Sequence, residues 1–162
     1  MAQEELQMHG SMFLLFHNFI ESNYGKDTWL EINKLAGTVH SKYEMHENFP
    51  ASEMIALIGA AATYSGLSEN DLKEKFGEHL VPTLLDIYKS HVNPAWRTFE
   101  ILENTELVMH KAVRKQENKA APPILNVSRV HDKLLIIDYY SKRKMASLAI
   151  GIIKGIARYY NE

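Results

Sequence analysis

The hydrophobic pattern of the chain changes once, at the Ala-Pro-Pro triplet 121–123, and this change limits the folds that the sequence can adopt. Before the triplet, apolar residues recur at helical spacing, most clearly in 12–20. After it, β-rich runs at 124–130 and 134–140 lie close enough together to form an antiparallel hairpin. A helix over 145–160 follows. The sequence therefore predicts an α+β fold with an N-terminal helical bundle, a short antiparallel sheet and a C-terminal helix.

Glycine and proline residues predict the helix boundaries of the first part. Gly25 and Gly37 suit C-terminal caps, so helices are expected to end at Tyr24 and Ala36. A loop over 38–50 and a helix over 51–64, rich in small residues, come next. The further expectations are a helix that starts after the capping residue Ser68, a break or kink that Pro82 causes in that helix near 77–81, and a long helix from Pro94 to about Glu117.

Composition excludes several classes of protein. The 162 residues suit one domain, and the absence of cysteine excludes disulfides, zinc-thiolate sites, iron–sulfur clusters and thiol catalysis. A net charge of −2 gives no basic surface for nucleic acid. The most apolar stretches, 54–63 and 145–153, are shorter than the roughly 20 residues of a membrane span. The acidic start does not resemble a targeting peptide. We therefore expect a cytoplasmic protein without membrane insertion.

The second β-rich run carries the most specific polar pattern. Strand alternation places two apolar residues and then three hydrogen-bond donors on one face, namely Leu135, Ile137, Tyr139, Ser141 and Arg143. Two hydroxyls and a guanidinium could together hold one or two carboxylates, because the planar donors of arginine match carboxylate geometry. The alternative is an amphipathic strand whose end runs into solvent. Spacing alone leaves both interpretations open.

The eight histidines do not by themselves define a site. A cluster in the loop (His40, Glu44, His46 and Glu47) could bind a metal, but its spacing fits no zinc pattern and a solvated loop is the simpler interpretation. The helical face around His110 is mixed, with apolar residues beside Glu103, Glu106 and Arg114. Periodicity therefore does not show whether His110 points into a pocket. Neither a nucleophile–base pair nor another catalytic motif is evident, so the protein is not expected to be an enzyme.

Several of these residues together resemble a known family. His110, the triplet 121–123, the motif Tyr139-x-Ser141-x-Arg143 and the segment 151–153 are similar to the haem nitric oxide/oxygen binding (H-NOX) family, which includes the haem domain of soluble guanylate cyclase and bacterial gas sensors. The start at Met8-His9-Gly10 fits as well. The resemblance covers about residues 8–160. It implies a leader or flexible start over 1–7 and a single haem-binding domain over 8–162 that lacks the usual last two strands.

The resemblance also implies roles for individual residues. Haem b would lie between the helical and the sheet-containing parts, with His110 as the proximal ligand of its iron. Tyr139, Ser141 and Arg143 would bind the haem propionates, and Pro123 would press on the porphyrin from the proximal side. Four apolar residues, Met12, Phe16, Leu80 and Leu148, would lie on the distal side.

The distal residues imply a choice of ligand. Relatives that hold oxygen use a distal tyrosine in the final helix, and the matching residue here is Leu148. An apolar pocket offers no donor to bound oxygen, so the implied ligands are NO and CO. Loss or weakening of the iron–His110 bond would signal to a partner such as a histidine kinase, a cyclic-nucleotide enzyme or a chemotaxis receptor. The alternative is a haem-free binding module for a small apolar carboxylate, anchored by Arg143.

Overall fold

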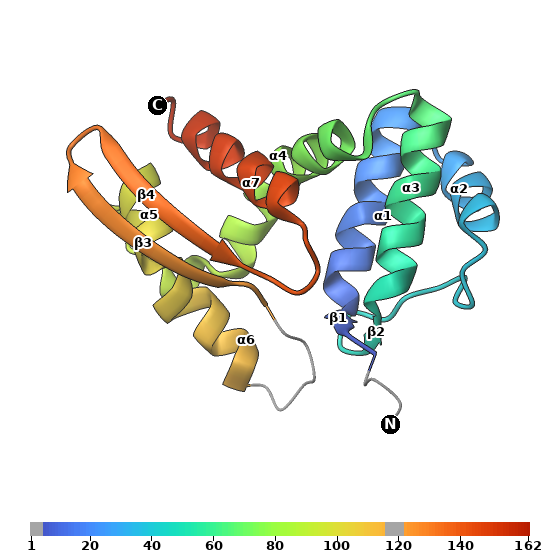
Figure 1. Ribbon diagram of the computed structural model, residues 1–162, viewed down its shortest axis with the longest axis horizontal. Helices are drawn as coiled ribbons and strands as arrows, with labels where there is room; N and C mark the ends of the chain where they lie inside the picture. The colour runs from blue at the N-terminus through green and yellow to red at the C-terminus, as the bar shows by residue number, and fades with distance from the viewer. Residues whose placement is uncertain (1–4, 116–121) are drawn as a thin grey trace.

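Two crossing helices, α4 (Glu69–Ile87) and α7 (Ala146–Tyr159), occupy the centre of the computed structural model, which describes residues 5–115 and 122–162 (Figure 1). Glycines allow this crossing to be very close. A Cβ atom added to Gly151 would lie 2.1 Å from the Glu74 carbonyl oxygen, and one added to Gly77 would lie 2.4 Å from the Leu148 carbonyl oxygen. The two backbones are therefore in direct contact, and no larger residue fits at either glycine without movement.

The N-terminal helices stand on one side of this pair (Figure 1). They are α1 (Gly10–Tyr24), α2 (Thr28–Ala36) and α3 (Ala51–Ser65). Gly37 and Gly66 end α2 and α3 in the left-handed conformation, with φ of 65° and 73°, which glycine adopts without steric cost. A small antiparallel sheet joins the start of this bundle to the loop before α3, and its strands are β1 (Gln7–His9) and β2 (Asn48–Pro50).

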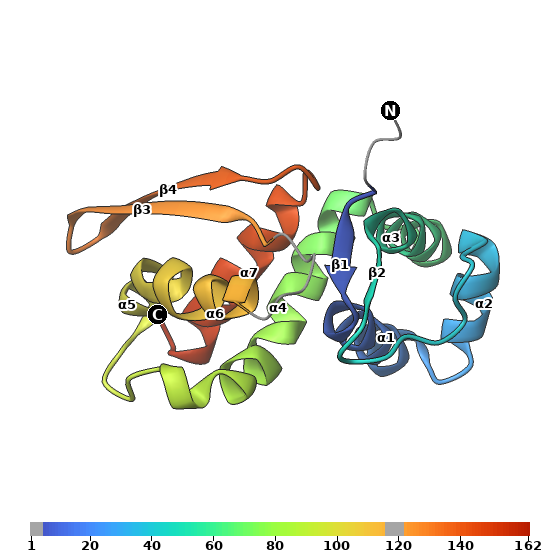
Figure 2. The ribbon, with the colours of Figure 1, turned by 90° about the horizontal axis from the view of Figure 1, so that it is seen from below.

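The hairpin and its supporting helices form the other side. After η1 (Lys89–His91) come α5 (Thr98–Thr105), the π-helical turn η2 (Glu106–His110) and α6 (Lys111–Lys115). The strands β3 (Ile124–His131) and β4 (Leu134–Tyr140) pair antiparallel with a bulge between Arg129 and His131. Figure 2 shows this hairpin as a layer that covers α5 and α6.

Two apolar clusters meet along the central helices. The larger cluster contains most of the N-terminal bundle with Leu80 of α4 and Leu148 of α7. The smaller one contains Val81 of α4 and Ile156 of α7, packed with α5 and with the inner face of the hairpin. Because α4 and α7 contribute to both clusters, a change at their crossing affects both halves of the molecule.

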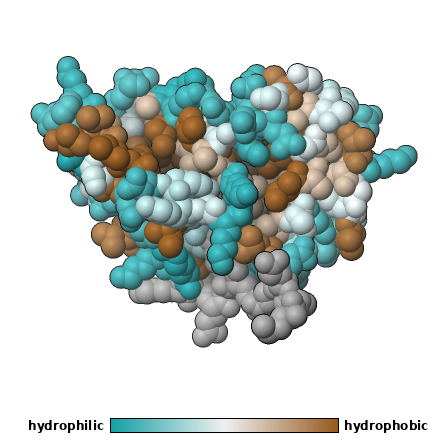
Figure 3. Space-filling model, in the orientation of Figure 1, coloured by the Kyte–Doolittle hydropathy of each residue, from teal (hydrophilic) through white to brown (hydrophobic). Residues whose placement is uncertain are grey.

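The outer face of the hairpin is exposed and partly apolar. Figure 3 shows apolar residues gathered on this side of the molecule. Five exposed apolar residues lie on this face, namely Ile124, Val130, Leu134, Ile136 and Tyr140. Within residues 5–115 and 122–162, no helix is both long enough and apolar enough to cross a membrane.

The predicted α+β class and the order of its parts are confirmed, but three local expectations are wrong in whole or in part. Helix α4 is not broken near 77–81 but continues through Pro82 to Ile87, and buried Val81 and Leu85 pack the helix on either side of the proline into one cluster. The loop over 38–50 ends in strand β2. The expected helix from Pro94 begins only at Thr98, and its regular geometry is interrupted by η2.

Local hydrogen bonds explain the late start of α5. The Asn93 side chain accepts from the Ala95 backbone N–H at 2.9 Å and forms a turn before the helix. The Glu100 carboxylate then accepts from the Arg97 backbone N–H at 3.0 Å, which satisfies a donor at the helix start. The segment expected to be a leader also contributes to the fold, since Gln7 pairs with Pro50 in the β1–β2 sheet.

Candidate functional site

His110 lies at the junction of η2 and α6 with its side chain only 18% exposed. Its Nδ1 is 2.9 Å from Oε2 of Glu106, one turn earlier. Burial lowers the pKa of His110, and the hydrogen bond to Glu106 opposes that shift only in part. The imidazole is therefore neutral near pH 7. Because an ionised carboxylate only accepts hydrogen bonds, the proton of this neutral ring lies on Nδ1, and Nε2 keeps a free electron pair.

Glu106 connects the histidine to the start of the hairpin. Its Oε2 also accepts from the Leu125 backbone N–H at 3.1 Å, and its Oε1 pairs with Arg114. Arg114 donates in turn to the Pro123 carbonyl oxygen at 3.0 Å. Burial tends to raise the pKa of Glu106, but the bonds from Arg114 and His110 outweigh it and hold that pKa below its usual value. Glu106 is thus an ionised carboxylate that accepts hydrogen bonds from several donors.

Pro123 lies beside this network and contributes its carbonyl oxygen to it. Its backbone is close enough to His110 to raise the pKa of the ring, against the larger lowering effect of burial. The structure therefore brings His110 and Pro123 together from segments 13 positions apart in the chain. The neighbouring residues 116–121 lie outside the described part, so the expected helix end at Glu117 and the first residue of the triplet are not described.

The motif Tyr139-x-Ser141-x-Arg143 begins at the same open end of the hairpin, because Tyr139 pairs with Leu125. Strand β4 ends at Tyr140, so the predicted alternation extends only to Tyr139, and Ser141 and Arg143 lie in the following turn. This turn groups them: the Arg143 backbone N–H donates to Ser141 Oγ at 3.2 Å. Tyr139 is also close enough to raise the pKa of Arg143 slightly against the larger, opposite effect of burial.

Arg143 has an unsatisfied donor. Its Nη2 donates to the Gln7 carbonyl oxygen at 2.8 Å, whereas its buried Nε has no hydrogen-bond partner in the described structure. A buried cation without a counter-ion is unfavourable. A carboxylate on a bound molecule would remove this cost, because arginine binds carboxylates through parallel N–H donors.

The residues expected on the distal side come together in the larger apolar cluster. Phe16 and Leu80 are fully buried, Leu148 is 8% exposed, and Met12 is partly buried and packs against this cluster. All four of these side chains are apolar, so none of them brings a hydrogen-bond donor to the cluster.

Together these residues fit a haem group. His110 offers a neutral imidazole nitrogen, and such a nitrogen is a common iron ligand. Arg143 offers a buried, unsatisfied donor suited to a propionate. Phe16, Leu80 and Leu148 offer an apolar surface. In the described part of the chain, no group of three or more histidine, aspartate or glutamate side chains could hold a free metal ion.

One of the loop histidines, His40, has a structural role. His40 Nδ1 and the Tyr43 hydroxyl each contact the buried Glu53 carboxylate at 2.7 Å. Burial and the bond to Glu53 raise the pKa of Tyr43 well above its usual value. These contacts hold the loop over 38–50 against α3. They support the simpler interpretation of this cluster over a metal site.

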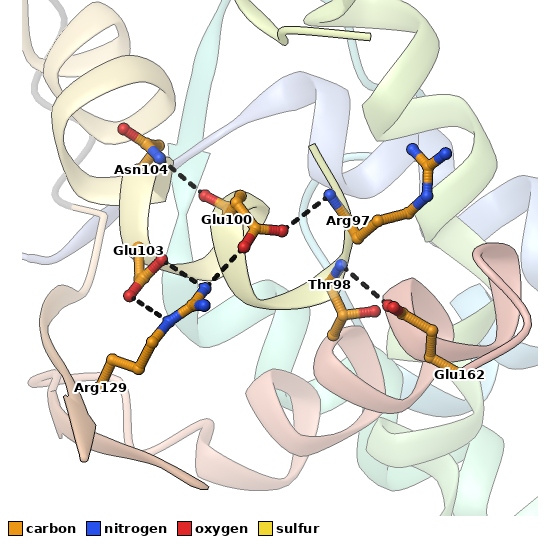
Figure 4. A network of polar contacts seen from close by, with 7 residues as sticks. All are labelled: Arg97, Thr98, Glu100, Glu103, Asn104, Arg129 and Glu162. Carbon is orange, nitrogen blue, oxygen red and sulfur yellow. Dashed lines mark hydrogen bonds and ion pairs between the residues drawn. The ribbon is translucent and has the colours of Figure 1, made fainter. Parts of the chain in front are cut away.

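A second polar network holds the hairpin on α5 (Figure 4). Arg129 of β3 binds the carboxylates of Glu100 and Glu103 at 2.7–2.9 Å. Its guanidinium also lies 5.1 Å from the ring centre of Phe99. Residue Glu162 accepts from the Thr98 backbone N–H at 3.1 Å at the start of the same helix. These contacts join β3 and the C-terminal residue to α5.

Sequence reasoning missed the role of Glu106 and Arg114. The signal was present, because Glu106 and His110 have the i, i+4 spacing of helical neighbours. What could not be read was the contact with the hairpin. The Leu125 N–H and the Pro123 carbonyl reach this network only through the folded arrangement of β3 beside η2.

Comparisons with known proteins identify the family and the fold. The family model described as Haem-NO-binding matches residues 9–162. An H-NOX protein from S. oneidensis in the Fe(II)NO ligation state has a TM-score of 0.86 at 19% identity, over 95% of this chain and 86% of that one. An Fe(II) unliganded H-NOX protein from K. algicida has a TM-score of 0.85 at 23% identity, over 95% and 84%.

A curated relative is much longer than this chain. Soluble guanylate cyclase 89Da of Drosophila melanogaster is 22% identical over 157 residues, which are 93% of this chain and 23% of the relative. The chain thus spans about a quarter of that protein. The fold is that of an H-NOX domain. The chain belongs to the Haem-NO-binding family, whose members are haem-based gas-sensor domains.

Proposed function

We propose that this protein is a sensor of NO and CO that holds haem b between its N-terminal helices and its hairpin. The observation that carries this proposal is the buried Nε of Arg143, which has no acceptor among residues 5–115 and 122–162. Membership of the Haem-NO-binding family identifies the group that would supply the missing carboxylate. Haem, when bound, would supply the iron at which diatomic gases bind.

Several residues of this chain would each contact a different part of the haem. His110 would coordinate the iron through Nε2, since Nδ1 is held by Glu106. Tyr139, Ser141 and Arg143 would bind the propionates, and Pro123 would contact the proximal face of the porphyrin. Each assignment follows the resemblance and is supported by the positions of these side chains around the hairpin.

The choice of ligand follows from the apolar distal residues. Met12, Phe16, Leu80 and Leu148 offer no hydrogen-bond donor. Bound oxygen carries partial negative charge and needs such a donor far more than NO or CO does. We therefore propose that the protein binds NO and CO and does not hold oxygen stably.

Signalling would begin with the loss or weakening of the bond between His110 and iron. His110 is part of a continuous segment from α5 through η2 to α6, and Glu106 joins that segment to β3. Release of His110 would allow this segment to move relative to the hairpin, and a ligand that favours one of two arrangements can switch a protein. A partner would read the movement, for which the candidates are a histidine kinase, a cyclic-nucleotide enzyme and a chemotaxis receptor. The domain itself would be non-catalytic and cytoplasmic.

The test is a haem titration of the His110→Ala variant beside the wild-type protein. We expect the wild-type protein to develop a strong Soret band and the variant to bind haem weakly, with partial recovery when imidazole is added. His131→Ala, at an exposed position in the hairpin, is the matched control and should behave as the wild type does. Unchanged haem binding by His110→Ala would refute the ligand assignment.

The haem-free alternative makes a different prediction in the same assay. A module for small apolar carboxylates would show no Soret band with either protein. It would instead be stabilised against heat by a medium-chain fatty acid, and Arg143→Ala would abolish that stabilisation. The unsatisfied Arg143 Nε is compatible with both ligands, so this comparison separates them.

A further inference from the structure

The contacts of Glu106 suggest a role beyond holding two segments together. Its Oε2 is placed 2.9 Å from Nδ1 of His110, on the side of the ring away from Nε2. The side chain is about three-quarters buried, with 24% exposed, so solvent screens this contact only weakly. Glu106 is also fixed from two further directions by Arg114 and by the Leu125 N–H. The carboxylate therefore acts on the histidine from a fixed position.

We infer that Glu106 is a positioning residue that sets the strength of the iron–His110 bond, an inference that depends on the proposed function. A carboxylate that accepts the Nδ1–H proton makes the imidazole a stronger electron donor through Nε2 and fixes the ring orientation. A stronger donor favours ferric over ferrous iron. It also resists the release of His110 that signalling requires, so Glu106 determines how readily the switch operates.

Arg114 limits this effect. Its guanidinium pairs with Oε1 of Glu106, so part of the negative charge is shared with a cation instead of the histidine. Arg114 also donates to the Pro123 carbonyl oxygen, which ties this adjustment to the segment beside the porphyrin. The two residues should therefore have opposite effects on the iron. Glu106 increases the donor strength of His110, and Arg114 decreases it.

The experiment compares three variants of the haem-loaded protein with the wild type. Glu106→Gln keeps the shape of the side chain and removes its charge. Arg114→Met removes the competing cation. Glu103→Gln is the matched control, because Glu103 is an ion-paired glutamate of the adjoining helix that binds Arg129 and not His110. Circular dichroism first establishes that each variant folds.

Two readouts report on the bond itself, namely the ferric/ferrous midpoint potential and the ferrous iron–histidine stretching frequency. In Glu106→Gln we expect a roughly tenfold loss of ferric preference, which raises a one-electron midpoint potential by about 59 mV, and a lower stretching frequency. Arg114→Met should shift both quantities in the opposite direction. Glu103→Gln should leave both at the wild-type values.

The outcomes separate this inference from the proposed function. If Glu106→Gln and Glu103→Gln give the same potential and stretching frequency while the wild-type iron is bound by His110, the role of Glu106 is refuted and the haem assignment stands. If Arg114→Met shifts the potential in the same direction as Glu106→Gln, the opposing roles are refuted. If the wild-type protein binds no haem, the proposed function itself fails.

Discussion

Replacement of Gly151 by alanine tests the central α4–α7 crossing, because two physical effects predict opposite results. Alanine is favoured over glycine inside a helix by about 1 kcal/mol, so helix propensity alone predicts a more stable protein. Packing predicts a less stable protein. The new Cβ would lie 2.1 Å from the Glu74 carbonyl oxygen, whereas ordinary contacts begin at 3.4 Å.

The size of the expected stability loss depends on which atoms must move. Relief of the contact requires the α4 and α7 backbones to separate by about 1.3 Å, since the obstructing atoms belong to the main chain. Overpacking in a core costs about 1–3 kcal/mol, and backbone obstruction places this site near the upper end. After the gain in helix propensity, we expect Gly151→Ala to lose about 2 kcal/mol, which corresponds to a fall in Tm of about 4–8 °C.

The assay is urea and thermal unfolding followed by circular dichroism, with Gly59→Ala of α3 as the matched control. A Cβ at Gly59 would meet only the end of the Glu69 side chain, at 3.5 Å. This variant should therefore gain stability by about 0.5–1 kcal/mol, because helix propensity acts there without obstruction. If Gly151→Ala is as stable as the wild type or more stable, the close crossing of α4 and α7 is refuted.

Two further predictions concern the cap at the start of α4 and the ion pair between β3 and α5. Ser68 Oγ accepts from the Asp71 backbone N–H at 3.1 Å. Ser68→Ala should therefore lower the free energy of unfolding, measured in urea, by about 1 kcal/mol. A loss no larger than that of Ser128→Ala, at an exposed position of β3, would contradict the capping role. Arg129 holds the pKa of Glu100 below its ordinary value of 4.5. A carboxyl whose pKa is lower in the folded than in the unfolded state stabilises the fold at a pH above its unfolded pKa, and it loses this contribution as the pH falls towards its folded pKa. Arg129→Met should therefore lower Tm at pH 7, and the difference from the wild type should shrink as the pH falls below 4.5; a difference that does not depend on pH would show that the ion pairs are unimportant.

The sequence predicts the order of elements well because local signals set it. Gly25 and Gly37 lie directly after α1 and α2, and Ser68 caps α4 as expected. The errors arise where tertiary contacts override local preference. Pro82 remains inside α4, where buried Val81 and Leu85 pack the helix on either side of it, and strand β2 forms only because β1 lies beside it.

The candidate site could be predicted from the sequence only through its motif. Strand alternation grouped Tyr139 with Ser141 and Arg143, although a turn and not the strand brings the last two together. The helical face around His110 looked mixed because it carries Glu106, and no periodicity argument shows that a charge on that face bonds to the histidine. The contact between η2 and the start of β3 depends on the fold and has no local signal.

The measurement that tests the account most directly is the absorption spectrum of the purified, haem-loaded and reduced protein, recorded before and after addition of NO, CO and air. The account predicts a five-coordinate ferrous spectrum that shifts with NO and with CO and only oxidises slowly in air. A stable spectrum of bound oxygen would contradict the assignment of Leu148 and its neighbours to an apolar distal side. Absence of a Soret band after addition of haem would contradict the proposed function as a whole.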